Sequence, residues 1–365
     1  MAYIRDLVTH DRQAEFRNDV QLSHYDNPKT NLGLIQSFIF SYNAPRGMVS
    51  AVDLLETLRG VFTIARQENR LVCIANYGHG KSHLALVLAN YFAKPYGSPE
   101  LEKVLEKVSK AVDNQTKLQR LREFRQEQGE FLVVRLRGDE NIGLREQFMN
   151  QIQVALQEHQ ATKNERLAFW SEKALQLLDN LSAEQKEKAE QFLETMETDL
   201  PGLRGDVRNH RDQGYDRTRQ LFKHLNGYLP DLGGEVSLQK LVKQVAKDYC
   251  GEGKPLAGLV VLFDEFSLFI QRYAQRRSAG ELQELLVGIE DLGNKAVFLA
   301  FSQHDPITVA KNYSSSREQS EGLERELTRI PRKVLLYSLL ESVIDAYLNQ
   351  PADAWKEFAS NRQVR

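Results

Sequence analysis

Leu71-Val-Cys-Ile-Ala75-Asn-Tyr-Gly-His-Gly80-Lys81-Ser82 is the stretch that decides the fold of this chain. Its apolar beginning is typical of a buried β-strand, its glycine-rich middle predicts a turn, and the Leu- and Ala-rich residues 83–92 after it predict a helix. A glycine-rich loop between a strand and a helix is the context in which proteins cradle the phosphates of a nucleotide. Ala75 stands where the first glycine of such a loop usually lies, which places one methyl group at its entrance.

The residues of this loop have distinct expected roles. Gly78 and Gly80 let backbone N–H groups turn inward on the phosphates, Lys81 reaches the β and γ oxygens, and Ser82 ligates magnesium. The helix that begins near Lys81 adds its positive N-terminal end to the same site. The expected nucleotide-binding residues are Asn76, Tyr77, Gly78, His79, Gly80, Lys81, Ser82 and His83. For the two histidines, packing within the loop or helix is favoured over a phosphate contact.

A second motif, Leu259-Val-Val-Leu-Phe-Asp264-Glu265, is an apolar strand that ends in two carboxylates. Ligands of open α/β sheets bind at the carboxyl ends of the strands. We expect Asp264 to hold magnesium through water and Glu265 to polarise the attacking water as general base. An acidic pair at this position can also be a helix N-cap, but its combination with the loop favours catalysis.

Two further residues are candidates for the same chemistry. Gln303 follows the predicted strand 296–301. If that strand lies beside the Asp264 strand, Gln303 points between the γ-phosphate and the attacking water. The competing interpretation is that Gln303 is a turn residue. Arg329 precedes the apolar run 334–337 and could reach a neighbouring subunit's γ-phosphate, although surface arginines are common. The predicted catalytic set is Glu265, Lys81, Gln303 and Arg329.

The nucleotide is expected to be ATP with Mg²⁺. The guanine-reading signature Asn-Lys-x-Asp is absent, because Asn294-Lys295 is followed by Ala296-Val297.

The strand-like runs and the spacing between them predict the fold class and the domains. The runs 71–75, 131–136, 259–263 and 296–301 are continuously apolar and separated by helical segments, which predicts an α/β fold with a parallel sheet flanked by helices. Residues 141–250, about 110 in all, have the sequence pattern of helices. A βαβ crossover needs only about 30 residues in total, so most of this segment is surplus to the crossover. We expect an N-terminal extension at 1–46, an ATPase core at 47–140 and 251–337, a helical insertion at 141–250, and the start of a helical lid at 338–365.

The composition limits the function classes. The chain has 365 residues, 41% hydrophobic and 27% charged, and a formal net charge of −2 at pH 7. These values predict a globular protein with one sizeable core and a smaller attached domain. Basic and acidic residues are mixed, so no nucleic-acid arm is indicated. The arginines between 204 and 219 alternate with aspartates, which favours an ion-pair surface over phosphate-backbone contacts.

Cysteine usage and hydropathy point to a reducing compartment. Cys73 and Cys250 lie far apart with no Cys/His cluster around them, which argues against a zinc site or a disulfide framework. No apolar run has the length of a signal peptide or a bilayer span. We expect a cytoplasmic protein with no membrane attachment.

Four local motifs resemble the AAA+-type ATPases of bacterial phage-defence systems, and among them the BrxC/PglY-like ATPase of BREX systems. The motifs are residues 77–84, residues 263–266 with 282–286 after them, residues 301–303 and, more weakly, residues 328–334. In the fourth motif, Ile330 stands where the family usually has Phe. The resemblance covers roughly residues 50–345, and members of the family are generally much longer than this chain.

This resemblance implies an AAA+/ASCE-like P-loop NTPase that forms homo-oligomers. It implies that ATP turnover is coupled to assembly or remodelling of a defence complex, with other defence-system proteins and double-stranded DNA as partners. Two alternatives stay open: an ATP-dependent assembly switch or scaffold with little turnover, and an initiator-like or helicase-loader-like ATPase on DNA. A nuclease has no support, because no spaced carboxylate and His set lies outside the expected ATP site.

Overall fold

The computed structural model describes residues 20–76, 78, 80–111, 115–165, 169–208, 212–230, 232, 237–275 and 280–337, together with the backbone at 9–10 and 348–349. The chain divides into two compact units, one made of residues 1–141 and 243–365 and the other of residues 142–242. The predicted helical insertion was 141–250. The predicted lid, 338–365, lies outside the described residues, apart from the short strand at 348–349.

A parallel sheet of five strands forms the centre of the first unit, as the apolar runs predicted. Its strands lie in the order β3-β4-β5-β2-β6 and all neighbours are parallel. Their bounds are β2 (Arg70–Ile74), β3 (Leu132–Arg137), β4 (Leu259–Asp264), β5 (Ala296–Ser302) and β6 (Arg332–Leu335). A separate pair, β1 (Thr9–His10) and β7 (Leu348–Asn349), is antiparallel.

The strand order brings the predicted motifs to one edge of the sheet. β5 lies between β4 and β2, so the strand that ends before Gln303 is the neighbour of the strand that ends at Asp264. Since all these strands are parallel, their carboxyl ends meet at the same edge. The condition on which the role of Gln303 depended is therefore met.

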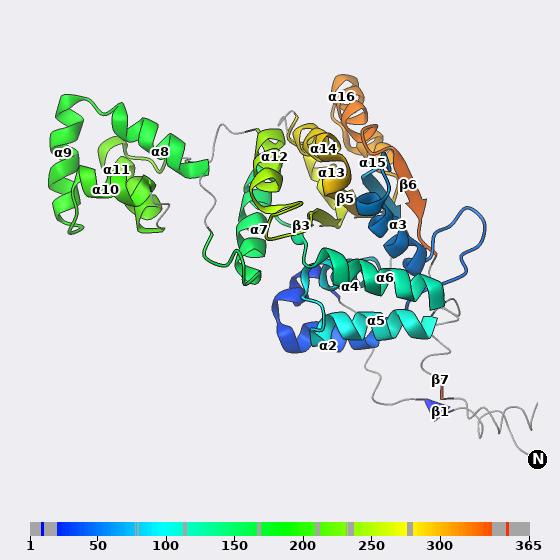
Figure 1. The fold of residues 1–365 in the computed structure, drawn as a ribbon. Coiled ribbons are helices and arrows are strands. Elements are labelled where there is room, and N and C mark those ends of the chain that lie inside the picture. The colour runs from blue at the N-terminus through cyan, green and yellow to red at the C-terminus, as the bar shows by residue number, and fades with distance from the viewer. Residues whose placement is uncertain are drawn as a thin grey trace, which may run out of the picture. The chain divides into compact units, whose positions relative to one another are not determined.

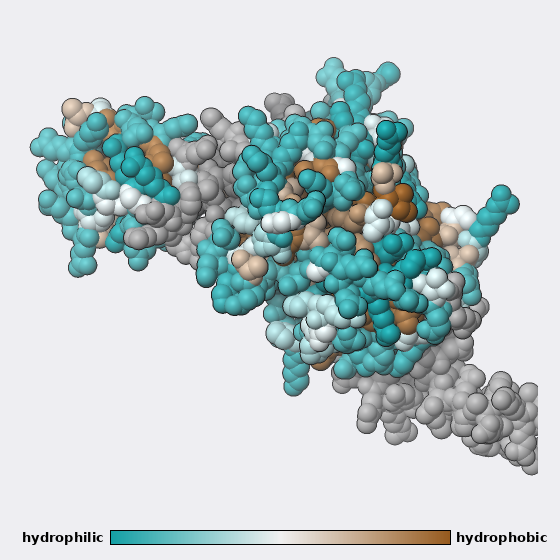
Figure 2. Space-filling model, viewed as in Figure 1, coloured by the Kyte–Doolittle hydropathy of each residue, from teal (hydrophilic) through white to brown (hydrophobic). Residues whose placement is uncertain are grey.

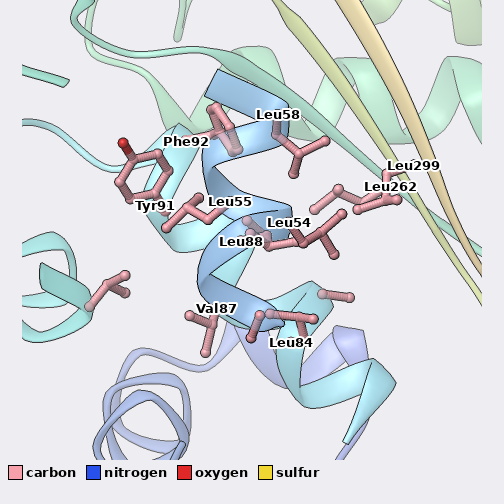
Figure 3. Packing of buried hydrophobic residues seen from close by; sticks show 14 of the residues in the cluster. Leu54, Leu55, Leu58, Leu84, Val87, Leu88, Tyr91, Phe92, Leu262 and Leu299 are labelled. Carbon is pink, nitrogen blue, oxygen red and sulfur yellow. The ribbon is translucent and has the colours of Figure 1, made fainter. Parts of the chain in front are cut away.

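One face of the sheet is covered by α3 (Ala51–Thr63) and α4 (Lys81–Ala93). Figure 3 shows leucines of both helices meeting Leu262 and Leu299 of the sheet in one cluster. Ser50 caps α3, since its Oγ accepts a hydrogen bond from the Asp53 N–H at 3.1 Å. The helices α5 (Pro99–Ala111) and α6 (Gln115–Gln128), which the sequence analysis did not identify, add their apolar faces to the same cluster.

Part of the predicted N-terminal extension belongs to this core. Residues 22–26 form a 3-10 helix, η1 (Leu22–Asp26), and α2 (Pro28–Ser37) follows it. Leu34 and Ile35 are buried in the same cluster as α3 and α4. Asn31 of α2 and Asn90 of α4 exchange two side-chain hydrogen bonds of 2.8 Å in the interior. Residues 22–37 therefore stabilise the unit that carries the glycine-rich loop.

The opposite face of the sheet contacts α13 (Phe266–Gln275) and α14 (Glu281–Leu292). A 3-10 turn, η2 (Gly293–Lys295), leads from α14 into β5, while α15 (Pro306–Tyr313) and α16 (Arg317–Leu327) lie between β5 and β6 in the chain. Figure 1 shows the two helical layers on either side of the sheet.

The second unit is helical. It contains α7 (Leu144–Glu158), α8 (Phe169–Asp179), α9 (Ala183–Glu194), α10 (Leu200–Arg208) and α11 (Asp212–Asn226), and α12 (Leu238–Tyr249) crosses its boundary. Helices α8 to α11 share their own apolar cluster. Arg204 pairs with Asp179 at 2.8 Å and Arg217 with Asp206 at 3.0 Å, which favours the ion-pair interpretation of the arginine-rich stretch.

The face of the molecule seen in Figure 2 is mainly polar. Figure 2 shows a face on which hydrophilic residues predominate and hydrophobic ones appear in scattered patches. Within the described ranges, no helix combines the length and the apolar character that a bilayer span requires.

The Asn31–Asn90 pair provides a test of how firmly the N-terminal helix belongs to the core. Asn31→Ala and Asn90→Ala should each lower the free energy of unfolding by about 1–3 kcal/mol, because each leaves a buried amide without its partner. In a double-mutant cycle measured by urea unfolding, the two losses should not add. Asn312→Ala, at an exposed position of α15, is the control. Strictly additive losses would contradict the pairing.

Candidate active site

The glycine-rich loop joins β2 to α4 at the carboxyl edge of the sheet. Gly78 and Gly80 have φ values of 77° and 73°, in the left-handed region that residues with a side chain rarely adopt. Gly80 is the N-cap of α4, so the unpaired N–H groups of the first helical turn face the loop. This is the geometry in which a helix N-terminus binds an anion. Two predicted loop residues, Tyr77 and His79, lie outside the described residues.

Lys81 is folded back onto the loop. Its Nζ donates hydrogen bonds of 2.9 Å to the carbonyl oxygens of Ala75 and Asn76, and the residue is only 7% exposed. Burial lowers the pKa of Lys81, while the charges of Glu265 and then Asp264 raise it. The ammonium group is therefore placed between the loop and the acidic pair, where it can exchange carbonyl partners for phosphate oxygens.

Asp264 connects the two motifs. Its side chain is buried, and its Oδ1 accepts from the Glu265 N–H at 3.0 Å. Burial raises the pKa of Asp264, and the Ser82 side chain, which lies close by, opposes this shift. The pKa of Glu265 is also raised, first by burial and then by the charge of Asp264. Asp139, at the end of β3, raises both pKa values further.

Glu265 has a constrained backbone. Its φ is 52°, which is unusual for a residue with a long side chain and costs conformational energy. Its carbonyl oxygen accepts hydrogen bonds from the Leu268 and Phe269 N–H groups at 3.0 and 3.1 Å, so the pair does open α13. The side chain of Asp264 also contacts Ser82, and a residue that served only as a helix N-cap would not need this contact.

Ser267 holds the end of β5 against α13, a role that the sequence analysis missed. Its Oγ lies 2.7 Å from the Ser302 Oγ and accepts from the Gln303 N–H at 3.0 Å. The main chain of Gln303 is thereby tied to the helix that Glu265 begins. A serine two residues after an acidic pair carries no signal of this contact, because its partner is 35 positions away in the chain.

Two predicted site residues point elsewhere within this chain. The His83 Nε2–H donates to the Leu34 carbonyl oxygen at 2.7 Å, and its ring packs edge-on against Phe38 at 4.9 Å. Burial lowers the pKa of His83 and favours the neutral ring, so this geometry favours the packing interpretation. Arg329 precedes β6, at the sheet edge opposite the loop, with its Nη1 3.5 Å from the Glu290 Oε2.

The oxygen atoms of Ser82 and Asp264 fit a magnesium ion. Mg²⁺ prefers oxygen ligands and is usually held by one or two protein groups, with waters and substrate phosphates completing its shell. Within the described residues, no group of three or more His, Cys, Asp or Glu side chains is placed to hold a metal ion. The raised pKa values of both carboxyls show that their negative charge is poorly solvated, and a cation would offset it.

Because Glu265 has a strained backbone and a poorly solvated charge, its replacement should stabilise the folded protein, although it removes the expected general base. Glu265→Asn should raise the free energy of unfolding of the nucleotide-free protein by about 1 kcal/mol at pH 7, because Asn tolerates a positive φ. Glu265→Gln removes the same charge but keeps the long side chain, so its gain should be smaller. Thermal unfolding of the three proteins measures the difference.

The pH dependence of this gain has a defined sign. The folded-state pKa of Glu265 is raised, so the contribution of its carboxyl group to stability is complete below about 4.5 and is lost as the pH rises through the folded pKa. The advantage of both variants should therefore grow above pH 4.5. Equal stability of all three proteins at pH 7 would contradict the strain and the charge effect together.

Comparison of the chain with protein-family models, with curated proteins and with solved structures finds no match. The resemblance to defence ATPases thus depends on the four motifs.

Proposed function

We propose that this protein binds Mg-ATP and hydrolyses it. The observation that carries the proposal is that the glycine-rich loop and the acidic pair lie at the same edge of the sheet, where Lys81 and Asp264 are both buried and the Ser82 side chain acts on Asp264. The two motifs lie far apart in the sequence, and each of them alone could have a purely structural role. Their contact beneath a buried lysine is the arrangement that phosphoryl transfer requires.

The residues divide the work as follows. The loop amides and Lys81 bind the phosphates, and Lys81 gives up its bonds to Ala75 and Asn76 as it does so. Ser82 and Asp264 would hold magnesium, which neutralises charge on the phosphate oxygens. Glu265 orients the attacking water and accepts its proton, for which a raised pKa is suited. Gln303, tied by its main chain to Ser267, lies at the same edge and binds the γ-phosphate or the water.

The proposal extends to an AAA+-like P-loop ATPase that works as a homo-oligomer in an anti-phage defence complex. Arg329 supports the oligomer: it lies at the far edge of the sheet and its side chain is 39% exposed, so it is available to a neighbouring subunit's γ-phosphate rather than its own. Other defence proteins and double-stranded DNA are the proposed partners.

The first experiment is ATP hydrolysis by the wild type and Glu265→Gln, with and without double-stranded DNA, beside a size measurement in ATP. Wild-type turnover should fall by at least about 100-fold in the variant, as expected when a catalytic base is removed. Assembly in ATP should persist, because the binding residues are intact. Stimulation by DNA would support a role on nucleic acid. A wild type that assembles in ATP without any turnover would instead favour the assembly switch.

Nucleotide binding can be measured separately from turnover. Mg-ATP at about 100 times its dissociation constant should stabilise the wild type by about 2.7 kcal/mol. Lys81→Ala should abolish this stabilisation, because it removes the only lysine of the loop. The control is Lys311→Ala, a change at an exposed position of α15. A Lys81→Ala protein that is stabilised like the wild type would reject the assigned site.

A further inference from the structure

The turn that follows β3 presses against the main chain of Glu265. The Gly138 N–H donates a hydrogen bond of 2.9 Å to the Asp264 carbonyl oxygen. A Cβ atom at Gly138 would lie 2.8 Å from the Glu265 carbonyl carbon and 2.9 Å from the Phe269 nitrogen, closer than any side chain can approach. Only glycine therefore allows the turn to reach the acidic pair.

Arg272 fixes this turn to the helix that Glu265 begins. Its Nη1 donates to the carbonyl oxygens of Gly138 and Glu140 at 3.1 and 3.2 Å, and the guanidinium is partly buried. Charged donors to two carbonyl oxygens form stronger hydrogen bonds than neutral ones. The turn is thus held from one side by Asp264 and from the other by Arg272.

We infer that Arg272 is a positioning residue for Glu265, acting through the turn at residues 138–140. The inference rests on the proposed ATPase function. A left-handed glutamate is costly and persists only where its surroundings over-determine it. Two sets of contacts do so here: the α13 N–H groups that bind the Glu265 carbonyl oxygen, and the turn packed against that carbonyl group. Without Arg272 the turn can withdraw, and Glu265 relaxes and moves its carboxylate.

The test compares Arg272→Ala and Arg272→Lys with Arg317→Ala, a control whose side chain is 91% exposed on α16. Arg272→Ala should lower kcat about 100-fold with an unchanged KM for ATP, as expected from a displacement of about 1 Å at the reacting group. Arg272→Lys should recover part of the loss. In the Glu265→Gln background, Arg272→Ala should cost no more, because the two residues act as one unit.

The unchanged KM and the partial recovery by Arg272→Lys separate this role from general loosening of the core. An unchanged kcat, or an equal loss in the Glu265→Gln background, would overturn the inference.

Amide hydrogen exchange tests, without any ATP turnover, whether Arg272 holds the turn at residues 138–140. Exchange should accelerate at Gly138, Leu268 and Phe269 in Arg272→Ala, and stay unchanged in the apolar cluster of α3 and α4. Unchanged exchange at these three amides would reject this role of Arg272. If the wild type hydrolyses no ATP, the ATPase proposal fails, while this measurement still decides whether Arg272 holds the turn.

Discussion

The removal of three charges from water at one edge of the sheet is the constraint on which the rest of the structure depends. Lys81 and Asp264 are almost fully buried, and Glu265 has a pKa raised by burial. Buried charges are tolerated only where hydrogen bonds and opposite charges compensate them. Here the loop carbonyls bind the ammonium group, the Glu265 N–H and the nearby Ser82 side chain stabilise the Asp264 carboxylate, and Lys81 lies near both acids. The remaining negative charge is what a cation would balance.

Helix α13 organises this edge. It begins at the strained Glu265, holds the end of β5 through Ser267, and holds the end of β3 through Arg272. One helix therefore fixes the ends of two strands relative to the acidic pair that ends the strand between them. The aromatic side chains of Phe263, Phe266 and Phe269 pack against one another at the start of this helix and give it a rigid apolar base.

Most of the sheet was predictable because β2, β3, β4 and β5 are buried along almost their whole length and are therefore mainly apolar runs. The helices missed by the sequence analysis are of a different kind. In α5 the apolar residues Leu101, Val104, Leu105 and Val108 do recur at helical spacing, and this signal could have been used. In α2 the burial of Asn31 could not be inferred, because a polar residue enters the core only when a partner such as Asn90 is present.

The sequence by itself determined the strand-loop-helix around Lys81, the acidic end of β4 and the α/β class, because each depends on local periodicity and on residue types at short spacing. Only the tertiary structure decided which strands are neighbours, and so which polar side chains meet. The contact of Ser82 with Asp264, the attachment of Gln303 to Ser267, the turn of His83 toward Leu34 and the close approach of Gly138 to Glu265 all join residues distant in the chain. Such contacts follow from the order of strands in the sheet, which no local pattern encodes.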